Sequence, residues 1–486
     1  MKATIIGAGL GGLSAAINLA ATGMEVSVFE THDQAGGKAG SVVIDGVEVD
    51  TGPSVLTMPD VLDAVLQQAG RRLSDVLTLR DPRPSFRYRY PDGAVVDVFP
   101  TLEETADSIE QSLGAGARRE LLAFMEYASS IWNTAAPHFV YGPAPTWMST
   151  LTLGLKQMHR LARIDPLRTM QRSIYGRITS PHLRKLLLRY ATYNGSDPRR
   201  APATLSCIAH VELALGGFGI QGGISAMVSA MVEAAQSLGV RIFLGSPVES
   251  ILLEGKRVRG VIVGGEIHRT DIVIAGTDAA LLAQRLLPAG APHGIRLEQD
   301  ASMSGWNAIY RAKRRERVGH TVLFCADYEQ EFADIFDRDR PPQDPTIYLC
   351  AQEPCHGRAG WANEEAVFAM ANAPAEPEHG RRAEIWTALQ ERVTQRLKSQ
   401  DLLAPDDQAV WTRNPAQLAA RFPGSRGSIY GAASNDMLAA FRRPPNRLSG
   451  IPGLYLASGS AHPGGGMPLA MLSGQAAANA AMEDLR

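Results

Sequence analysis

A glycine-rich turn close to the N-terminus limits what this chain can fold into more than any other feature. Residues 7–12 read Gly-Ala-Gly-Leu-Gly-Gly and stand between a short strand-like run, residues 3–6, and an apolar helical stretch, residues 13–22. A GxGxxG turn that leads from a strand into a helix is typical of dinucleotide-binding folds, since the helix N-terminus then faces a pyrophosphate. We therefore expect the chain to begin with a βαβ unit, completed by a strand at residues 25–30.

Each glycine of this turn has its own expected task. Gly7 allows the tight turn, Gly9 lets the backbone approach the pyrophosphate, and Gly12 lets the helix pack closely on the strand. Glu30 ends the next predicted strand, at the distance where an acidic residue binds the ribose hydroxyls of a dinucleotide. The turn, the strand, the helix and Glu30 together predict a nucleotide site.

A second pair of glycines narrows the choice of cofactor. Gly36-Gly37-Lys38 follows shortly after the ribose acid, an arrangement that resembles FAD-binding enzymes with a two-dinucleotide-binding fold. The resemblance implies that Gly37 belongs to the FAD site and that Lys38 is a cation beside the adenosine or the pyrophosphate. An ordinary loop is the alternative explanation of the two glycines.

Further candidate FAD contacts are assigned from their place in the chain. Residues 50–55 come where the same enzymes pass under the flavin, although Asp50 could instead end a hairpin. A valine after the helix expected at 224–238 stands where this superfamily binds adenine through its backbone, and a plain strand valine would look the same. The Gly-rich residues 459–467 precede a C-terminal helix, whose dipole would stabilise negative charge on a reduced flavin. The residues assigned in this way are Ser54, Val55, Val248, Gly459 and Met467.

Charge and cysteine content exclude several other classes. The chain has 48 Lys and Arg against 50 Asp and Glu, so its overall charge does not favour nucleic acid as a partner. Four cysteines are too few for a disulfide scaffold in 486 residues. Cys350 and Cys355 lack a paired set of ligands, so we expect reduced thiols and no metal site. Glycine or proline interrupts the uncharged stretches 3–24 and 448–482, so we expect neither a transmembrane helix nor export.

The order of these signals predicts an α/β fold whose Rossmann-like, two-dinucleotide-binding FAD domain is built from discontinuous segments. An inserted second domain would complete it, and the family resemblance given in the next paragraph implies that this is an α+β substrate domain accompanied by a helical membrane-facing region. Residues 59–80 and 101–132 are expected to be helical. The expected segments are 1–85, 205–290 and 445–486 for the FAD domain, 86–142 and 291–444 for the substrate domain, and 143–204 for the membrane-facing region.

These motifs, in this order, resemble the phytoene desaturase family of carotenoid desaturases over nearly the whole chain. The resemblance includes GAGLGGLSAA at the N-terminus and APATL at residues 201–205. RYATY at 189–193 and HPGGGMP at 462–468 look most like the 1-hydroxycarotenoid 3,4-desaturases, which act on hydroxy- or methoxyneurosporene. Residues 216–221 depart from the pattern of relatives, a difference that bears on the substrate and not on the cofactor.

The resemblance implies non-covalently bound FAD and an acyclic C40 carotenoid substrate taken from a membrane. Quinone or oxygen would accept the electrons. The sequence leaves several alternatives open on the same fold. These are a phytoene desaturase, a carotenoid cis–trans isomerase, an amine-oxidase-like flavoenzyme and a non-catalytic lipid-binding escort protein.

One stretch of this nearly neutral chain is strongly basic. Residues 151–200 hold eleven Lys and Arg against two Asp. Lys156, Arg160 and Arg163 fall within about 60° of one another on a helical wheel, opposite an apolar face. A basic amphipathic helix suits an anionic membrane surface, so we expect peripheral association on the cytoplasmic side. A solvated basic face is the alternative.

No Ser/His/Asp set or paired carboxylates stand out in the sequence. Desaturation removes two hydrogens from adjacent carbons, and the polyene itself stabilises charge, so the site needs positioning and dryness more than strong acid–base groups. His462 is the catalytic candidate, with capping of its turn as the alternative. Burying the hydroxyl of a hydroxylated substrate requires a polar partner, for which Tyr193, Asn194 and His210 are unranked candidates.

Overall fold

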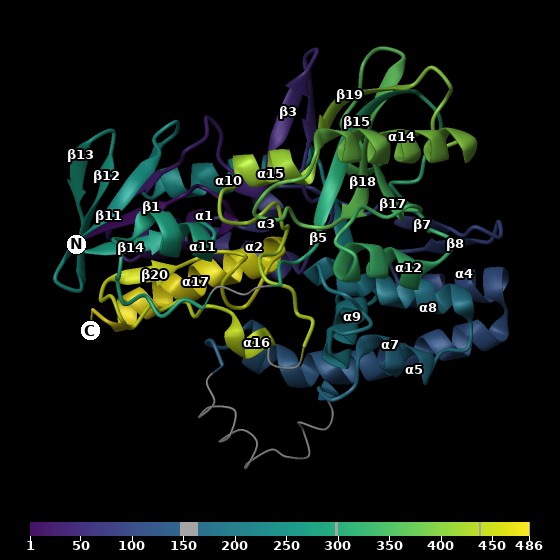
Figure 1. The fold of residues 1–486 in the computed structure, drawn as a ribbon, viewed down its shortest axis with the longest axis horizontal. Coiled ribbons are helices and arrows are strands. Elements are labelled where there is room, and N and C mark those ends of the chain that lie inside the picture. Colours follow the sequence, from purple (N-terminus) through teal and green to yellow (C-terminus); the bar gives the residue numbers. More distant parts are fainter. Residues whose placement is uncertain (146–163, 297–299, 437–438, 486) are drawn as a thin grey trace.

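A parallel sheet joins strands from distant stretches of the chain in the computed structural model, which describes residues 1–145, 164–296, 300–436 and 439–485 (Figure 1). The register of the two central strands places Ala3 beside Ile272 and Ile6 beside Ala275. The expected Rossmann-like domain built from discontinuous segments is confirmed. The strand order is β10 (Arg241–Phe243), β2 (Glu25–Phe29), β1 (Lys2–Ile6), β14 (Ile272–Ala275) and β20 (Leu454–Leu456).

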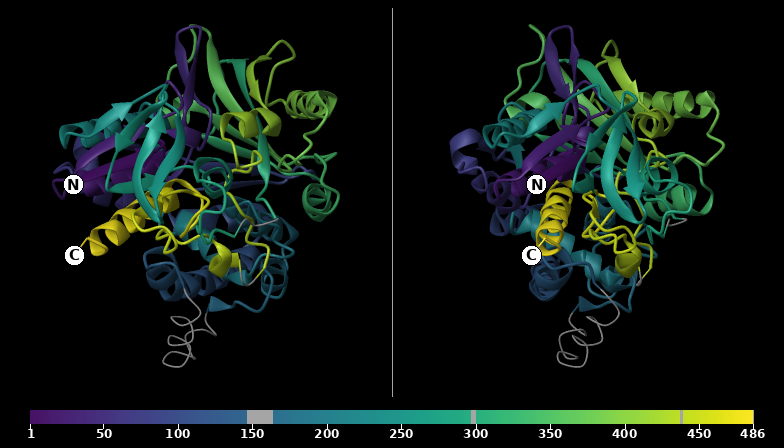
Figure 2. Two further views of the ribbon diagram at one scale, coloured as in Figure 1. Left: turned by 60° about the vertical axis from the view of Figure 1, so that its left-hand side comes forward. Right: turned by 90° about the vertical axis from the view of Figure 1, so that its left-hand side faces the viewer.

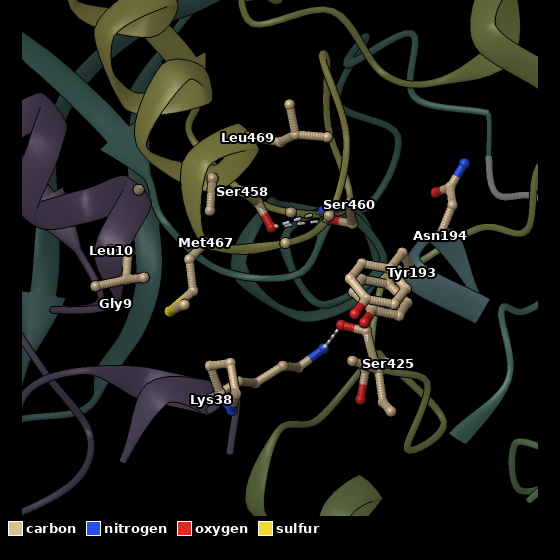
Figure 3. Close-up of a pocket in the computed structure, with 18 of the residues that line it drawn as sticks. Gly9, Leu10, Lys38, Tyr193, Asn194, Ser425, Ser458, Ser460, Met467 and Leu469 are labelled. Carbon is tan, nitrogen blue, oxygen red and sulfur yellow. Dashed lines mark hydrogen bonds between the residues drawn. The ribbon is translucent and has the colours of Figure 1, made fainter. Parts of the chain in front are cut away.

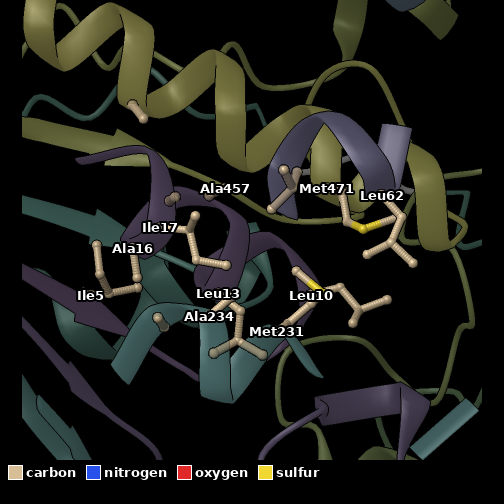
Figure 4. Close-up of a cluster of buried hydrophobic side chains, with 14 of the residues drawn as sticks. Ile5, Leu10, Leu13, Ala16, Ile17, Leu62, Met231, Ala234, Ala457 and Met471 are labelled. Carbon is tan, nitrogen blue, oxygen red and sulfur yellow. The ribbon is translucent and has the colours of Figure 1, made fainter. Parts of the chain in front are cut away.

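Helices α1 (Leu10–Ala20), α10 (Ile224–Ser237) and α17 (Met467–Glu483) pack together beside this sheet. Every residue of α1 is buried, and Figure 4 shows its apolar side chains between those of the other two helices. A Cβ on Gly474 of α17 would come within 2.2 Å of the Gly11 carbonyl oxygen. The two helices can therefore pack this closely only because residue 474 is glycine. The uncharged run at 3–24 is therefore a buried βα unit, which explains its likeness to a membrane segment.

A second, mostly antiparallel sheet forms the other main layer. Its side chains alternate between two environments, as the pleat requires: Ala369 and Ala371 belong to the core under α14 (Ala383–Ser399), whereas Phe368 and Met370 line a cavity. The strand order is β19 (Gln408–Arg413), β15 (Ser304–Lys313), β18 (Glu364–Ala373), β17 (Ile347–Ala351), β16 (His320–Leu323), β7 (Phe86–Arg89) and β8 (Val95–Val98).

Helices gather at one end of the molecule, the lower end in Figures 1 and 2. The stretch predicted as helical at 101–132 is broken at Gly114, which has a φ of 90°. The basic residues after 163 form short helices and a 3₁₀ turn at Arg189–Asn194 instead of one long helix. Nowhere in the described ranges does a helix combine the length and the apolarity needed to cross a membrane. The helices of this end include α4 (Leu102–Leu113), α5 (Ala115–Ala135), α7 (Met170–Tyr175), α8 (Pro181–Leu188) and α9 (Cys207–Leu213).

Smaller elements connect the layers. Residues 59–80 are helical only in part: α2 (Pro59–Gln67) ends before Gly70, whose φ is 70°, α3 (Leu73–Val76) follows it, and the stretch ends in the strand β6 (Leu79–Arg80). Another short helix, α12 (Tyr328–Phe332), lies further along the chain. The remaining strands are β3 (Ser41–Ile44) with β4 (Val47–Asp50), β5 (Leu56–Thr57) and β6 (Leu79–Arg80) with β9 (Gly217–Ile220), and β11 (Val248–Glu254), β12 (Arg257–Val263) and β13 (Glu266–Arg269).

Candidate functional site

A cavity of about 1220 Å³ is lined by residues from both sheets and from the helical end of the molecule. Every predicted FAD contact except Gly12 lines it, and so does His462. Figure 3 shows Gly9 and Met467 on one side of this space, with Tyr193 and Asn194 on the other. The wall that the helical end contributes is largely apolar. It includes Trp132, Phe139, Val140, Ile164, Leu167 and Ile208.

The three glycines of the GxGxxG pattern, Gly7, Gly9 and Gly12, have different surroundings, in agreement with their expected tasks. Gly7 has a φ of 94°, a conformation that favours glycine. A Cβ on Gly12 would lie 2.0 Å from the Gly7 carbonyl oxygen, so Gly12 is needed for packing. A Cβ on Gly9 would meet nothing within 4 Å. Because Gly9 lines the cavity, that open space is where a side chain would block a ligand's approach to the backbone.

Glu30 is buried at the end of β2 with its carboxylate fixed by backbone amides. Its two oxygens accept hydrogen bonds from the amide of Ala8 at 2.7 Å and from that of His32 at 2.9 Å. The carboxylate is thus attached directly to the glycine-rich turn. It lies on the cavity wall, in the place predicted for the ribose contact.

Lys38 points inward and connects the loop after β2 to the segment around Ser428. Gly36 and Gly37 both have positive φ, and the Lys38 ammonium donates to the carbonyls of Ser428 at 2.8 Å and Ile429 at 3.1 Å (Figure 3). Burial lowers the pKa of Lys38, and the nearby Asp278 carboxylate opposes that shift. Lys38 therefore places a cation in the cavity wall, close to the predicted pyrophosphate.

Arg413 is a second buried cation that the sequence did not suggest. It lines the cavity and donates to the Thr51 carbonyl. Its buried Nε has no hydrogen-bond partner in the described part of the chain. Burial, followed by the nearby charge of Arg421, lowers the pKa of Arg413 to about 10. No local pattern marks this residue, because it reaches the cavity only through the folding of β19 beside the N-terminal segment.

The C-terminal turn places a helix N-terminus at the cavity. Gly459, Gly465 and Met467 line it, and α17 begins at Met467 with Gly466 as its N-cap. The first amides of a helix lack intrahelical partners and carry partial positive charge. These groups are suited to a flavin ring that gains negative charge on reduction. Val248, at the start of β11, lines another part of the same cavity.

Asp50 does not reach the cavity and instead stabilises the fold around it. Its carboxylate accepts from the first amides of α10, Ile224 at 2.7 Å and Ser225 at 3.2 Å, and pairs with Arg358 at 3.1 Å. Burial raises the pKa of Asp50, against the Arg358 charge. Asp50 is thus a buried helix cap, while Ser54 and Val55 of the same run line the cavity.

His462 lines the cavity and anchors a neighbouring segment. Its Nε2 lies 2.9 Å from the Gly142 carbonyl oxygen, and its own carbonyl accepts from Asn446. Burial lowers the pKa of His462, so the neutral ring donates to Gly142 through Nε2. This contact agrees with a structural role in the turn. A catalytic role stays a prediction.

A thiol and imidazole cluster lies next to the cavity-lining Tyr348. The ligand atoms of His320, Cys350 and Cys355 all lie within 4.8 Å of one another, and the Tyr348 hydroxyl is 2.7 Å from His320 Nδ1. Sequence spacing missed this grouping, because His320 is distant in the chain but pairs with Cys350 across β16 and β17. The expectation of no metal site remains a prediction. The described contacts are hydrogen bonds that fix the orientation of Tyr348.

The residues present fit FAD. The free space over Gly9, the fixed Glu30 carboxylate and the N-terminus of α17 are the features that a dinucleotide with an anionic centre requires. Lys38 and the unpartnered Nε of Arg413 supply cations to the same cavity.

Comparison with known proteins agrees with this site. The family of flavin containing amine oxidoreductases matches residues 10–482. A hydroxyneurosporene desaturase of Rubrivivax gelatinosus is 32% identical over 100% of this chain and 94% of its own, and that of Cereibacter sphaeroides is 33% identical over 100% and 98%. A 4,4'-diapolycopene oxygenase of a Methylomonas species is 31% identical over 100% and 99%.

Solved structures share the fold at low identity. An oxidoreductase from Methanosarcina mazei matches with a TM-score of 0.64 at 16% identity, covering 99% of this chain and 100% of its own. A putrescine oxidase variant matches with a TM-score of 0.62 at 14% identity, covering 99% and 98%.

The chain therefore belongs to the flavin-containing amine oxidoreductases and, within them, to the carotenoid desaturase family. It is an FAD-dependent oxidoreductase, which argues against a non-catalytic escort protein. Its named relatives include both desaturases and oxygenases of carotenoids, so a carotenoid is the substrate class that they support.

Proposed function

We propose that this protein is a carotenoid 3,4-desaturase of acyclic C40 substrates of the 1-hydroxy- or methoxyneurosporene type. The observation that carries the proposal is the cavity, in which the nucleotide-binding turn and a large apolar wall line one space. Relatives named hydroxyneurosporene desaturases, each at least 32% identical to this chain, support the choice of substrate.

The lining suits a reaction that depends on positioning. Burial of apolar surface contributes about 25 cal/mol per Å², so the aromatic and aliphatic wall can bind a polyene along its length. When bound, FAD accepts the electrons removed from the substrate. The protein's own part is to hold the polyene beside the turn at 459–467 and to exclude water. Loss of the accompanying proton needs no strong base, because the polyene spreads the developing charge.

Membrane docking and a quinone or oxygen acceptor are parts of this proposal. Within the described residues, several basic side chains of 151–200 are already bound to groups of the protein. Arg168 pairs with Asp165, Arg199 pairs with Asp197, and Lys185 donates to two backbone carbonyls. Docking on an anionic, cytoplasmic-side surface would therefore depend most on basic residues that lie outside the described ranges. These are Lys156, Arg160 and Arg163.

The test is product analysis with defined substrates. Purified FAD-loaded protein is mixed with liposomes that hold 1-hydroxyneurosporene or neurosporene, with an added quinone. We expect the hydroxylated substrate to lose two hydrogens and shift its absorption to the red, and to turn over far faster than neurosporene. Equal or faster conversion of neurosporene or phytoene would contradict the narrow assignment and favour a phytoene desaturase.

Two other products would redirect the assignment. Addition of oxygen to the polyene would place the protein with the oxygenases among its relatives. A change of double-bond geometry without loss of hydrogen would support the isomerase alternative. Mass and absorption spectra of the extracted pigment separate all of these outcomes.

A further inference from the structure

Arg189 is a buried charge in the wall of the substrate cavity. It begins the 3₁₀ turn Arg189–Asn194, lines the cavity and is only 8% exposed. Its guanidinium carbon lies 5.1 Å from the ring centroid of Tyr193 and 5.5 Å from that of Tyr88. A buried guanidinium stays charged, so it needs either partners in the protein or a ligand.

Both oxygens of the neighbouring Glu212 carboxylate accept hydrogen bonds from tyrosines. The Tyr190 hydroxyl donates to one oxygen of Glu212 at 2.9 Å, and the Tyr193 hydroxyl donates to the other oxygen. Arg189 reaches the same carboxylate only at 3.8 Å. Glu212 is 5% exposed. The negative charge is thus partnered inside the protein, and Glu212 is not among the described residues that line the cavity.

Hydrogen-bond donors, in contrast, exceed the acceptors in this cluster. A guanidinium has five N–H groups, and the hydrogen bond described for that of Arg189 is the one from Nη1 to the Tyr88 hydroxyl at 3.0 Å. Tyr328 also lines the cavity, and its buried hydroxyl has no partner in the part of the chain that the structure describes. Burial, and then the Glu331 carboxylate, raises the pKa of Tyr328, so its hydroxyl remains a donor.

This cluster lies beside the turn that is expected to face the flavin. Tyr430 connects the two, because a Cβ on Gly195 would come within 2.8 Å of its ring, and a Cβ on Gly465 within 2.7 Å of its Cβ and ring. Gly195 directly follows the turn that Arg189 begins, and Gly465 belongs to the loop before α17. In a 1-hydroxycarotenoid the oxygen-bearing carbon C1 is two bonds from C3, so a 3,4-desaturase needs its oxygen-binding group close to the reacting bond.

We propose that Arg189 and Tyr328 form a subsite that donates hydrogen bonds to the terminal oxygen of the substrate, a hydroxyl or a methyl ether, and so selects oxygen-bearing polyenes over plain hydrocarbons. Both oxygen types accept hydrogen bonds, which explains how one site serves hydroxy and methoxy substrates. A hydrocarbon end leaves these donors buried without an acceptor, the situation in which enzymes discriminate most strongly. This inference rests on the proposed function and adds the residues that determine specificity.

The candidates suggested by the sequence are already occupied or lie elsewhere. The Tyr193 hydroxyl is bound to Glu212, and the side chain of Asn194 is bound to Ser434 and Arg443. His210 is absent from the described lining of the cavity. Arg189 and Tyr328 take their place because each has donor capacity that the described protein groups do not use.

The test compares selectivity in conservative variants of the FAD-loaded enzyme. Tyr328→Phe removes one hydroxyl and keeps the ring. The double variant Arg189→Met with Glu212→Gln removes the charge together with its counter-charge. Tyr310→Phe is the matched control, because its buried hydroxyl is bound to Thr394 and Tyr310 does not line the cavity. Liposomes supply 1-hydroxyneurosporene or neurosporene, and kcat/KM is measured for each.

We expect the ratio of kcat/KM, hydroxylated over plain substrate, to fall roughly tenfold in Tyr328→Phe and roughly a hundredfold in the double variant, with no change in the control. Bound flavin should remain at the wild-type level in all three. An unchanged ratio in both test variants, with flavin retained, would overturn the subsite.

Binding separates failure of the subsite from failure of the proposed function. Quenching of tryptophan fluorescence measures the affinity of each polyene without turnover. If the wild type converts neither carotenoid, or both equally, the proposed function fails. The subsite then stands only if the variants weaken binding of the hydroxylated polyene relative to neurosporene. It fails if they weaken both to the same extent.

Discussion

Around Gly9 the cavity wall is made of backbone, whereas around Arg189 it is made of side chains. At the nucleotide end, glycine conformations and backbone amides form most of the wall, and those of residues 7–37 lie close together in sequence, although the N-terminus of α17 comes from the other end of the chain. At the substrate end, the lining comes from α9, α12 and the turn at 189–194, with Tyr88 of β7 behind Arg189, and these elements meet only in the folded chain. The difference explains why the cofactor is easier to predict than the substrate.

The largest expected effect comes from filling the space over Gly9. Gly9→Val should abolish FAD binding, because the side chain would project into the cavity from a position where a Cβ meets nothing within 4 Å. The purified variant should be colourless but folded. Absorption at flavin wavelengths and thermal unfolding measure the two properties. Gly116→Val in α5 is the matched control, since a Cβ there also meets nothing within 4 Å, and it should keep its flavin.

A fully yellow Gly9→Val protein of normal stability would mean that the nucleotide does not use this turn. Such a result would contradict the view that the cofactor site is formed mainly by backbone and the substrate site mainly by side chains. The substrate end should be unaffected by Gly9→Val. Polyene binding by the flavin-free protein checks this expectation.

The sequence predicted the nucleotide end because its determinants are local. The turn, Glu30 and the glycine pair follow one another within a short stretch, and each has one conformational or electrostatic reason to be there. Arg413 was missed because it reaches the cavity from β19, far along the chain. The helical stretch expected at 59–80 is interrupted at Gly70, because a residue with positive φ cannot continue a right-handed helix.

Parts of the substrate end could not be predicted for a different reason. Tyr193 and Asn194 were correctly placed at the cavity, but sequence cannot show that their polar groups are bound to other side chains. Tyr328 has no distinguishing neighbours in sequence, and its unpartnered hydroxyl is visible only in the folded protein. Polar groups in an apolar wall therefore require a structure before they can be ranked.

The second prediction concerns Asp50, for which the sequence left two roles open, a place under the flavin or the end of a hairpin, and which the structure places at the end of the β3–β4 hairpin. Asp50→Ala should lower the free energy of unfolding by about 3–5 kcal/mol, because it leaves Arg358 and two helix amides without their buried partner. Urea unfolding measures the change. Glu48→Ala is the control, since Glu48 also pairs with Arg358 but is largely exposed, and it should cost less than about 1 kcal/mol.

If both variants lose the same small amount, the carboxylate of Asp50 is not a significant cap for α10. Loss of flavin by Asp50→Ala without loss of stability would return Asp50 to the cofactor site. Either result would mean that the structural role assigned to Asp50 is wrong.

The third prediction addresses the membrane. Changing Lys156, Arg160 and Arg163 to Glu should weaken binding to anionic liposomes by a few kcal/mol, at about 1 kcal/mol for each basic residue near the surface. Co-sedimentation at low salt measures it. Arg199→Glu with Arg200→Glu is a control from the same basic stretch, because both arginines contact Asp337 within the fold, and binding should persist. Unchanged sedimentation of the triple variant would contradict docking through these residues.

The smallest expected effect concerns His462, which lines the cavity and binds the Gly142 carbonyl. Burial lowers its pKa in the folded protein below the value of about 6.5 that an unfolded chain would show. Between those two values the unfolded chain binds more protons, so the stability that neutral His462 contributes is complete above about pH 6.5 and is lost as the pH falls.

His462→Gln keeps an N–H for the Gly142 carbonyl but does not titrate. The melting temperature of the wild type should therefore decline more steeply from pH 7 to pH 5 than that of His462→Gln, and the difference between the two curves removes the contribution of all other groups. Parallel curves would mean that protonation of His462 does not affect folding. If the variant also keeps full desaturase activity, His462 has no catalytic role and only anchors the turn.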